Sequence, residues 1–138
     1  MIASFTVEGV PVAKGRPRLT TRGGFARAYT PEKTRSFEAV VAEAAKTAVG
    51  LMPAYGGAVE LEAHFLIPIP KSWNRRDREA AINGAKYPTA KPDIDNYVKA
   101  ICDGMNGIVY VDDCQIVSER TTKRYGLDPG VSVTVRAL

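Results

Sequence analysis

The sequence predicts one domain of the α/β (α+β) class, in which helices flank a single mixed β-sheet. Three observations favour this fold class. The chain has 138 residues, the usual size of a single domain, so we assign 1–138 to one unit. Segments in which polar and apolar residues alternate are typical of strands, and they are interspersed with segments of helical apolar spacing. Glycine and proline separate these segments and give the element order β-α-β-α-α-β-β.

The first half of the chain predicts a strand, a basic arm, a helix and a second strand. Alternation over 2–10 and again over 59–67 is typical of strands with one buried face. Residues at about 12–29 combine glycine, proline, arginine and threonine without a period, which indicates an exposed arm or loop. Thr30 followed by Pro31 starts a helix well, as a hydroxyl N-cap and a proline at the first helical position.

The second half of the chain predicts two helices followed by two strands. Ser72 can cap a short helix inside a basic insertion at about 71–90. A longer helix is expected over 93–105, because its apolar residues recur at helical spacing and an Asn-Gly pair follows them. Two strands are expected over 115–125 and 131–138.

Composition excludes several classes of protein. No apolar run approaches the roughly 20 residues of a membrane helix, and the first residues lack the pattern of a signal peptide, so we expect a cytoplasmic protein. Cys102 and Cys114 lack the spacing of a zinc site, and we expect both thiols to be reduced and structural. The single histidine, His64, lies in the middle of a predicted strand and is expected to be structural.

Charge is unevenly distributed along the chain, although the formal net charge is only +4. Segments 13–36 and 71–91 are strongly basic, whereas 93–113 holds five aspartates and a single basic residue, Lys99. Basic flanks around an acidic centre favour a polyanionic substrate together with a metal ion that lets the acids approach it. The alternative is that these charges only form solvated faces and turns.

Asp93 and Asp95 are the first candidates for metal ligands. Two residues apart in a helix means about 200° of rotation, so two carboxylates inside the helix could not share one target. They can share one if Asp93 takes the extended N-cap position, which the preceding Pro92 favours, and Asp95 lies in the first turn. The alternative is that both residues merely stabilise the N-terminus of the helix.

Lys99 lies four residues after Asp95 and four residues before Asp103. In one interpretation these pairs are exposed salt bridges of a helix surface, worth roughly 0.3–0.5 kcal/mol each. In the other, Lys99 stands beside a metal-bound phosphate and stabilises the charge that develops as the bond breaks.

Asp112 and Asp113 are adjacent acids in a predicted reversing turn. Because two adjacent carboxylates repel each other, their presence in a turn needs a reason. Mg²⁺ supplies one, because it binds oxygen ligands and is typically held by one or two carboxylates together with phosphate oxygens. If the turn folds back over the helix start, Asp113 joins Asp93 and Asp95 around one ion, with Asp112 as a further candidate ligand. Such an ion would polarise a phosphoryl oxygen and lower the pKa of an attacking water.

Three segments carry a resemblance to a known family. Segment 91–99 (KPDIDNYVK), the turn 112–115 (DDCQ) and the stretch 11–18 (PVAKGRPR) resemble the RusA family of Holliday junction resolvases, including its phage and prophage members. The resemblance covers nearly the whole chain. The sequence departs from some members of this family in the insertion at 71–90 and in the KGRPR type of its N-terminal loop. Both differences affect the expected DNA contacts more than the expected catalytic residues.

The resemblance implies a homodimeric, Mg²⁺-dependent endonuclease, with Mn²⁺ as a substitute, that cuts four-way junction DNA during recombination and repair. It places the catalytic residues at Asp93, Asp95, Lys99 and Asp113. It implies that the enzyme uses no nucleotide cofactor, binds no membrane and acts in a bacterial or phage-infected cell. A homodimer also suits the substrate, because two sites related by a two-fold axis could nick paired strands of a nearly two-fold symmetric junction.

Clustered basic residues are the candidates for sequence-independent phosphate contacts. They are Lys14, Arg16, Arg18, Arg22 and Arg27 in the arm, and Arg75 and Arg76 in the insertion. Two other functions stay open at this point. One is a non-catalytic protein that binds branched DNA, and the other is a nuclease that acts on flaps or forks.

Overall fold

A mixed four-stranded sheet forms the centre of the protein. The structure, a computed structural model, describes residues 1–15, 18–20, 27–29 and 31–138. The strands follow the spatial order β1 (Ala3–Glu8), β6 (Gly130–Ala137), β4 (Val59–Pro68) and β5 (Ile116–Gly126). β6 runs antiparallel to both of its neighbours, and β4 and β5 are parallel. The predicted mixed sheet and the predicted order of elements are therefore confirmed.

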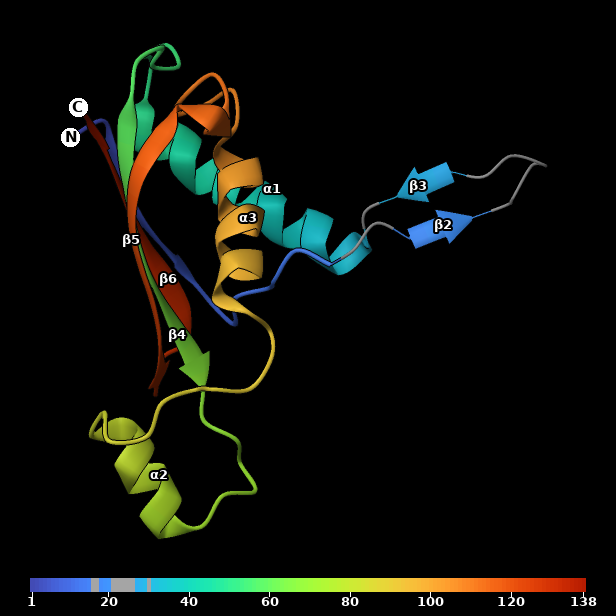
Figure 1. Cartoon of the computed structure of the whole chain (residues 1–138), viewed down its shortest axis with the longest axis vertical. Coiled ribbons are helices and arrows are strands. Elements are labelled where there is room, and N and C mark those ends of the chain that lie inside the picture. Colours follow the sequence, from blue (N-terminus) through green and yellow to red (C-terminus); the bar gives the residue numbers. More distant parts are fainter. Residues whose placement is uncertain (16–17, 21–26, 30) are drawn as a thin grey trace.

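Two helices cover one face of this sheet (Figure 1). They are α1 (Glu32–Val49) and α3 (Ile94–Met105). Alternate residues of β4, among them Leu61 and Phe65, point into the core below the helices and are fully buried. The helices approach each other closely at Gly104, where an added Cβ would lie 2.8 Å from Cγ1 of Val41. The sheet and α1 together fix the position of α3, which carries most of the candidate site.

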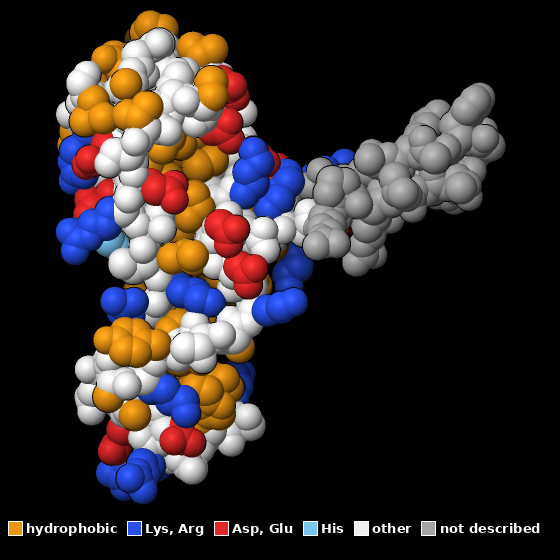
Figure 2. All heavy atoms as spheres, in the orientation of Figure 1, with side chains coloured by type: hydrophobic (Ala, Val, Ile, Leu, Met, Phe, Trp, Pro, Cys, Tyr) orange, Lys and Arg blue, Asp and Glu red, His pale blue; other side chains and the backbone are white. Residues whose placement is uncertain are grey.

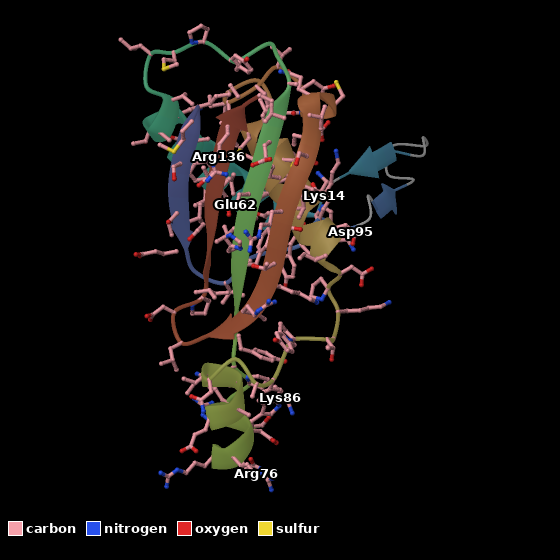
Figure 3. The ribbon with its side chains drawn as sticks, turned by 60° about the vertical axis from the view of Figure 1, so that its left-hand side comes forward. Lys14, Glu62, Arg76, Lys86, Asp95 and Arg136 are labelled. Atoms are coloured by element: carbon pink, nitrogen blue, oxygen red, sulfur yellow. The ribbon has the colours of Figure 1, made fainter. Side chains whose placement is uncertain are left out.

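The other face of the sheet is open and polar. On β4, Glu62 receives a hydrogen bond of 3.0 Å from Arg136 of β6, and His64 bonds to Thr122 of β5 at 2.7 Å. His64 thus has the satisfied structural role that the sequence predicts. Antiparallel pairs commonly leave one face to water, and Figure 3 shows Glu62 and Arg136 on this face.

The basic arm contains a short hairpin that the sequence did not predict. β2 (Arg18–Thr20) pairs antiparallel with β3 (Arg27–Tyr29), apart from the main sheet (Figure 1). Each of these strands is only three residues long, which is too short for alternation to indicate a strand within a basic segment rich in glycine and proline. The candidate contacts Arg16 and Arg22, and the predicted cap Thr30, lie outside the described residues. Helix α1 begins at Glu32, so Pro31 is its N-cap and not, as predicted, its first helical residue.

The insertion forms a separate lobe at the end of the sheet remote from both termini (Figure 1). We call residues 71–91, which contain α2 (Arg75–Ile82), the α2 lobe. The predicted cap Ser72 is wrong, because Asn74 caps α2 by accepting a hydrogen bond of 2.8 Å from the Asp77 N–H. Trp73 packs edge-on against Tyr125 of β5, with ring centres 5.1 Å apart. This contact joins the lobe to the main body.

The two cysteines differ in their surroundings. Cys102 lies inside α3 and is buried, and this burial raises the pKa of its thiol to about 12. Both thiols are free, as expected, but Cys114 is exposed in the turn before β5. Among the described residues, no helix has the length and apolar character needed to cross a membrane.

Candidate active site

The start of α3 presents two aspartates to solvent. Asp93 is the N-cap residue, with an extended backbone (φ −66°, ψ 148°), and Asp95 lies in the first turn. Both carboxylates are exposed, and among the described residues the Asp93 side chain makes no capping hydrogen bond. Capping alone therefore does not explain Asp93. The segment before the helix is held by Lys123 of β5, whose Nζ donates to the carbonyl oxygens of Ala90 (3.0 Å) and Pro92 (2.9 Å).

The Asp112–Asp113 turn is held by the side chain of Gln115. Its Oε1 accepts from the Asp112 N–H at 2.9 Å, and its Nε2 donates to the carbonyl oxygens of Tyr55 (2.7 Å) and Gly57 (2.8 Å). The turn is a short 3-10 helix over Asp113–Gln115. Sequence reasoning missed this role of Gln115, although an Asp followed three residues later by Gln is the pattern of a capping box.

Lys99 joins α3 to this turn. Its Nζ lies 3.0 Å from Oδ2 of Asp113 and 3.0 Å from Oδ1 of Asp103. The hydrogen bond to Asp113, and then the one to Asp103, raise the pKa of Lys99, so the ammonium stays charged. The predicted pairing of Lys99 with Asp103 is therefore present, but Lys99 also reaches across to a residue 14 positions away.

Asp95, Lys99 and Asp113 line one open hollow of about 270 Å³ beside β5. Glu119 of β5 lines the same hollow. Sequence reasoning missed Glu119, because the carboxylate reaches this place only through the pairing of β5 with β4, opposite the buried Leu61. The hollow thus has three carboxylates and one ammonium on its walls.

Asp93 lies at a different hollow. It lines a space together with Lys14, Lys91 and Asn96, on the side of α3 that faces the root of the arm. Asp93 at the extended N-cap and Asp95 in the first turn therefore line different hollows. Within the part of the chain that the structure describes, no three acidic, histidine or cysteine side chains lie close enough together to hold a metal ion. The expected convergence of Asp93, Asp95 and Asp113 is therefore not formed by the described side chains of one chain.

The donors of the hollow nevertheless fit a hard cation. Asp95, Asp113 and Glu119 offer only carboxylate oxygens, and no sulfur or imidazole group shares their hollow except the buried Cys102 thiol. Oxygen donors suit Mg²⁺, which keeps several waters and needs few protein ligands. Asp112 adjoins the group with an exposed carboxylate, whose pKa is lowered chiefly by a hydrogen bond from the Cys114 thiol.

The predicted basic contacts fall into two groups in the structure. Lys14 is paired within the protein, at 2.7 Å from Oε1 of Glu38 and 3.0 Å from Oδ2 of Asp103. Arg75 and Arg76 lie on α2 and are exposed, and Arg75 pairs with Glu79 at 2.9 Å. Figure 2 shows acidic side chains in the middle of the molecule, with basic ones around them and over the α2 end. A phosphate role for these residues stays a prediction.

An α+β domain that gathers carboxylates and a lysine in an open hollow, with basic surfaces beside it, has the features of an enzyme acting on a phosphodiester backbone. The family model of endodeoxyribonuclease RusA matches residues 8–136, so the chain belongs to the RusA endodeoxyribonuclease family. It is also 37% identical over 139 residues to the "Uncharacterized protein YqaN" of Bacillus subtilis (strain 168), a match that covers 96% of this chain and 94% of that protein. The family predicted from the sequence is confirmed.

Proposed function

We propose that this nuclease resolves four-way DNA junctions as a Mg²⁺-dependent homodimer, in recombination and repair in the cytoplasm of a bacterial or phage-infected cell. The observation that carries the proposal is the hollow that Asp95, Asp113 and Glu119 line together with Lys99. Membership of the RusA family supports a junction as the substrate. Basic residues on either side of an acidic centre support a substrate with a phosphate backbone.

Asp95 and Asp113 are the proposed Mg²⁺ ligands, with Glu119 in the same hollow and Asp112 next to it, whereas Asp93 lines the neighbouring hollow at the arm root. One or two carboxylates are enough when phosphate oxygens and waters complete the shell. A bound Mg²⁺, or Mn²⁺ in its place, supplies a Lewis acid at the phosphoryl oxygen and an acidified water. Lys99 then stabilises the negative charge that develops on the phosphate.

The basic residues are proposed to hold the arms of the junction without reading its bases. Arg18 and Arg27 lie on β2 and β3, and Arg75 and Arg76 lie on α2, so the two groups are on different elements. A homodimer would repeat both groups around a two-fold axis and present one hollow to each of two paired strands.

The experiment compares cleavage of three labelled substrates of equal length, namely a synthetic four-way junction, a flap and a linear duplex. We expect cleavage of the junction with Mg²⁺ or Mn²⁺ and none with EDTA. Asp95→Asn and Asp113→Asn should each lower the cleavage rate by at least a hundredfold, since removing one preorganised charge at a reacting centre has effects of that size. Asp128→Asn is the control, because Asp128 is an exposed acid in the turn between β5 and β6.

Each other result identifies a different function. Equal cutting of junction, flap and duplex would reject the junction assignment in favour of a more general nuclease. Tight junction binding without cutting, in any divalent metal, would indicate a non-catalytic DNA-binding protein. Full activity of both Asp→Asn variants would refute the assignment of the metal ligands.

A further inference from the structure

Five alternating charges run from α1 through the root of the arm to the catalytic turn. We call Glu38, Lys14, Asp103, Lys99 and Asp113 the charge chain. Its successive contacts are 2.7, 3.0, 3.0 and 3.0 Å long. The charge chain joins residues up to 99 positions apart in the sequence. They lie on α1, the arm root, α3 and the turn before β5.

Asp103 occupies the centre of the charge chain. One of its carboxylate oxygens, Oδ2, contacts Lys14, and the other, Oδ1, contacts Lys99. Its side chain is 19% exposed, against 53% for Lys99. A carboxylate this shielded by protein is less screened by solvent than an ordinary surface pair. Its hold on the more exposed lysine is correspondingly firmer than that of a typical exposed helix pair.

Asp113 cannot by itself keep Lys99 in place during the reaction. Under the proposed function, the Asp113 carboxylate binds the metal ion, and a carboxylate bound to a cation offers less negative charge to an ammonium group. Asp103 then becomes the main anionic partner of Lys99 on this side of α3. Without it, the long side chain of Lys99 would regain rotamers that point away from the hollow.

The arm root is fixed to both α3 and α1. The Lys14 N–H donates to the Asn96 carbonyl at 2.8 Å, and the Ala13 carbonyl accepts from Thr34 Oγ1 at 3.3 Å. Partial burial lowers the pKa of Lys14, but the hydrogen bonds to Glu38 and Asp103 outweigh this effect, and the pKa is raised. The Lys14 ammonium is therefore held as a charged partner of Asp103. Figure 3 shows Lys14 and Asp95 on the same side of the sheet.

We infer that Asp103 is a positioning residue for the catalytic Lys99, and that Lys14 anchors Asp103 to the root of the DNA-binding arm. The inference rests on the proposed function for the role of Lys99, but the position of Lys99 can be measured without any cleavage. Asp103 touches neither the metal ion nor the DNA in this assignment. It acts only through Lys99.

The first experiment measures the accessibility of Lys99. The protein is labelled briefly with acetic anhydride in the presence of Mg²⁺, and acetylation of each lysine is followed by mass spectrometry. Asp103→Asn keeps the shape of the side chain and removes its charge, so we expect Lys99 to be labelled several times faster than in the parent. Asp128→Asn should leave the rate at Lys99 unchanged. Unchanged labelling of Lys99 in Asp103→Asn would overturn the inference.

The second experiment is a double-mutant cycle on single-turnover junction cleavage. Asp103→Asn should lower the cleavage rate by roughly 10- to 100-fold, the effect of misplacing a reacting group, with junction Kd within twofold of the parent. In the Lys99→Met background the same substitution should have no further effect. Asp103→Glu, which retains the charge, should recover part of the rate. Additive effects of the two substitutions would overturn the inference.

A third variant tests the inference if Asp103→Asn does not fold. Lys14→Met removes the other partner of Asp103, and it should increase labelling of Lys99 by a smaller factor and leave the control lysine Lys46 unchanged. No increase at Lys99 would overturn the anchoring role of Lys14. If the parent cuts no DNA at all, the proposed function fails, while the labelling results still decide whether Asp103 positions Lys99.

Discussion

The charge chain and the α2 lobe use the same kinds of residues in opposite ways. In the charge chain every member is paired at 3.0 Å or less, and two lysines alternate with three acids. In the α2 lobe the side chain of Arg75 is 92% exposed, and the Lys86–Asp77 pair is 3.9 Å apart. Paired and shielded charges fix geometry, whereas exposed charges act at longer range and are weakened by salt.

The net charge of the molecule follows the same division. The α2 lobe holds six basic and two acidic residues, so its net charge of +4 equals that of the whole chain. Two of the nearby cations lie over aromatic rings, Lys86 over Trp73 at 4.6 Å and Arg124 over Tyr87 at 4.8 Å. Such contacts orient the cations while leaving them partly open to solvent. The lobe is suited to attract a polyanion, and the charge chain is suited to position one reacting group.

The largest effect is expected from removing the lysine of the charge chain. Lys99→Met should lower the single-turnover rate of junction cleavage by one to three orders of magnitude, because an ammonium at a phosphoryl centre stabilises the transition state on that scale. Junction affinity should hold, since one exposed contact among many is lost. The measurement compares the rate at saturating junction with the Kd from gel shift. A variant that cuts at the parental rate would show that Lys99 is only a surface salt-bridge partner.

A smaller effect is expected from pushing α1 and α3 apart. A Cβ at Gly104 would lie 2.8 Å from Val41 Cγ1 and 3.0 Å from the carbonyl oxygen of Glu38, a member of the charge chain. Gly104→Ala should therefore lower the free energy of unfolding in urea by about 1–3 kcal/mol, the usual cost of overpacking a core. Gly56→Ala is the control, because its Cβ would meet nothing within 4 Å. Equal stability of the two variants would contradict the close packing at Gly104.

Substitutions in the α2 lobe should change the affinity for junction DNA and leave the cleavage rate unchanged. Arg76→Ala should weaken junction binding several-fold at physiological salt and reduce the slope of log K against log salt by about 1, as expected for one phosphate contact. The rate at saturating junction should stay at the parental value. Lys46→Ala on α1 is the control, since Lys46 is also an exposed base but lies outside the lobe. Identical salt slopes for parent and Arg76→Ala would remove the lobe from the DNA interface.

The smallest effect is expected at the cysteines, and it tests the surroundings of the Asp112–Asp113 turn. Cys114 is exposed, but its hydrogen bond to Asp112 raises the pKa of the thiol, so less thiolate is present at neutral pH. Because thiolate is the reactive form, one thiol per folded chain should react with Ellman's reagent, and its rate should rise between pH 7 and pH 9. Cys102 should react only after unfolding. Two fast thiols in the folded protein would contradict the burial of Cys102.

The sequence predicted the parts of this molecule that depend on local pattern. Alternation along β4 and the apolar stripe of α3 are periodic, so the order of elements followed from them. Pro92 and the acidic residues that follow it predicted Asp93 as the N-cap residue, and the structure confirms this position. The motifs around Asp93 and Asp113 were specific enough to indicate the family.

The rest depended on contacts between distant segments. Lys14 and Asp103 are 89 positions apart, and no spacing in the sequence predicts their contact. Glu119 reaches the hollow only through the register of β5 on β4. Strands β2 and β3 have three residues each, too few for a periodic pattern to indicate them. Tertiary pairing, and not local preference, decides each of these features.

Under the proposed function, strand β5 sets the spacing between the proposed cleavage site and the proposed DNA contacts of the α2 lobe. The Asp112–Asp113 turn leads directly into its first residue, Ile116, and Tyr125 near its end contacts Trp73 of the α2 lobe. Nine steps of an extended strand span about 30 Å, close to the roughly 34 Å repeat of B-form DNA. A duplex lying along β5 would offer the lobe a phosphate about one helical repeat from the bond to be cut. Lengthening or shortening this strand would put the two contacts out of phase with the double helix.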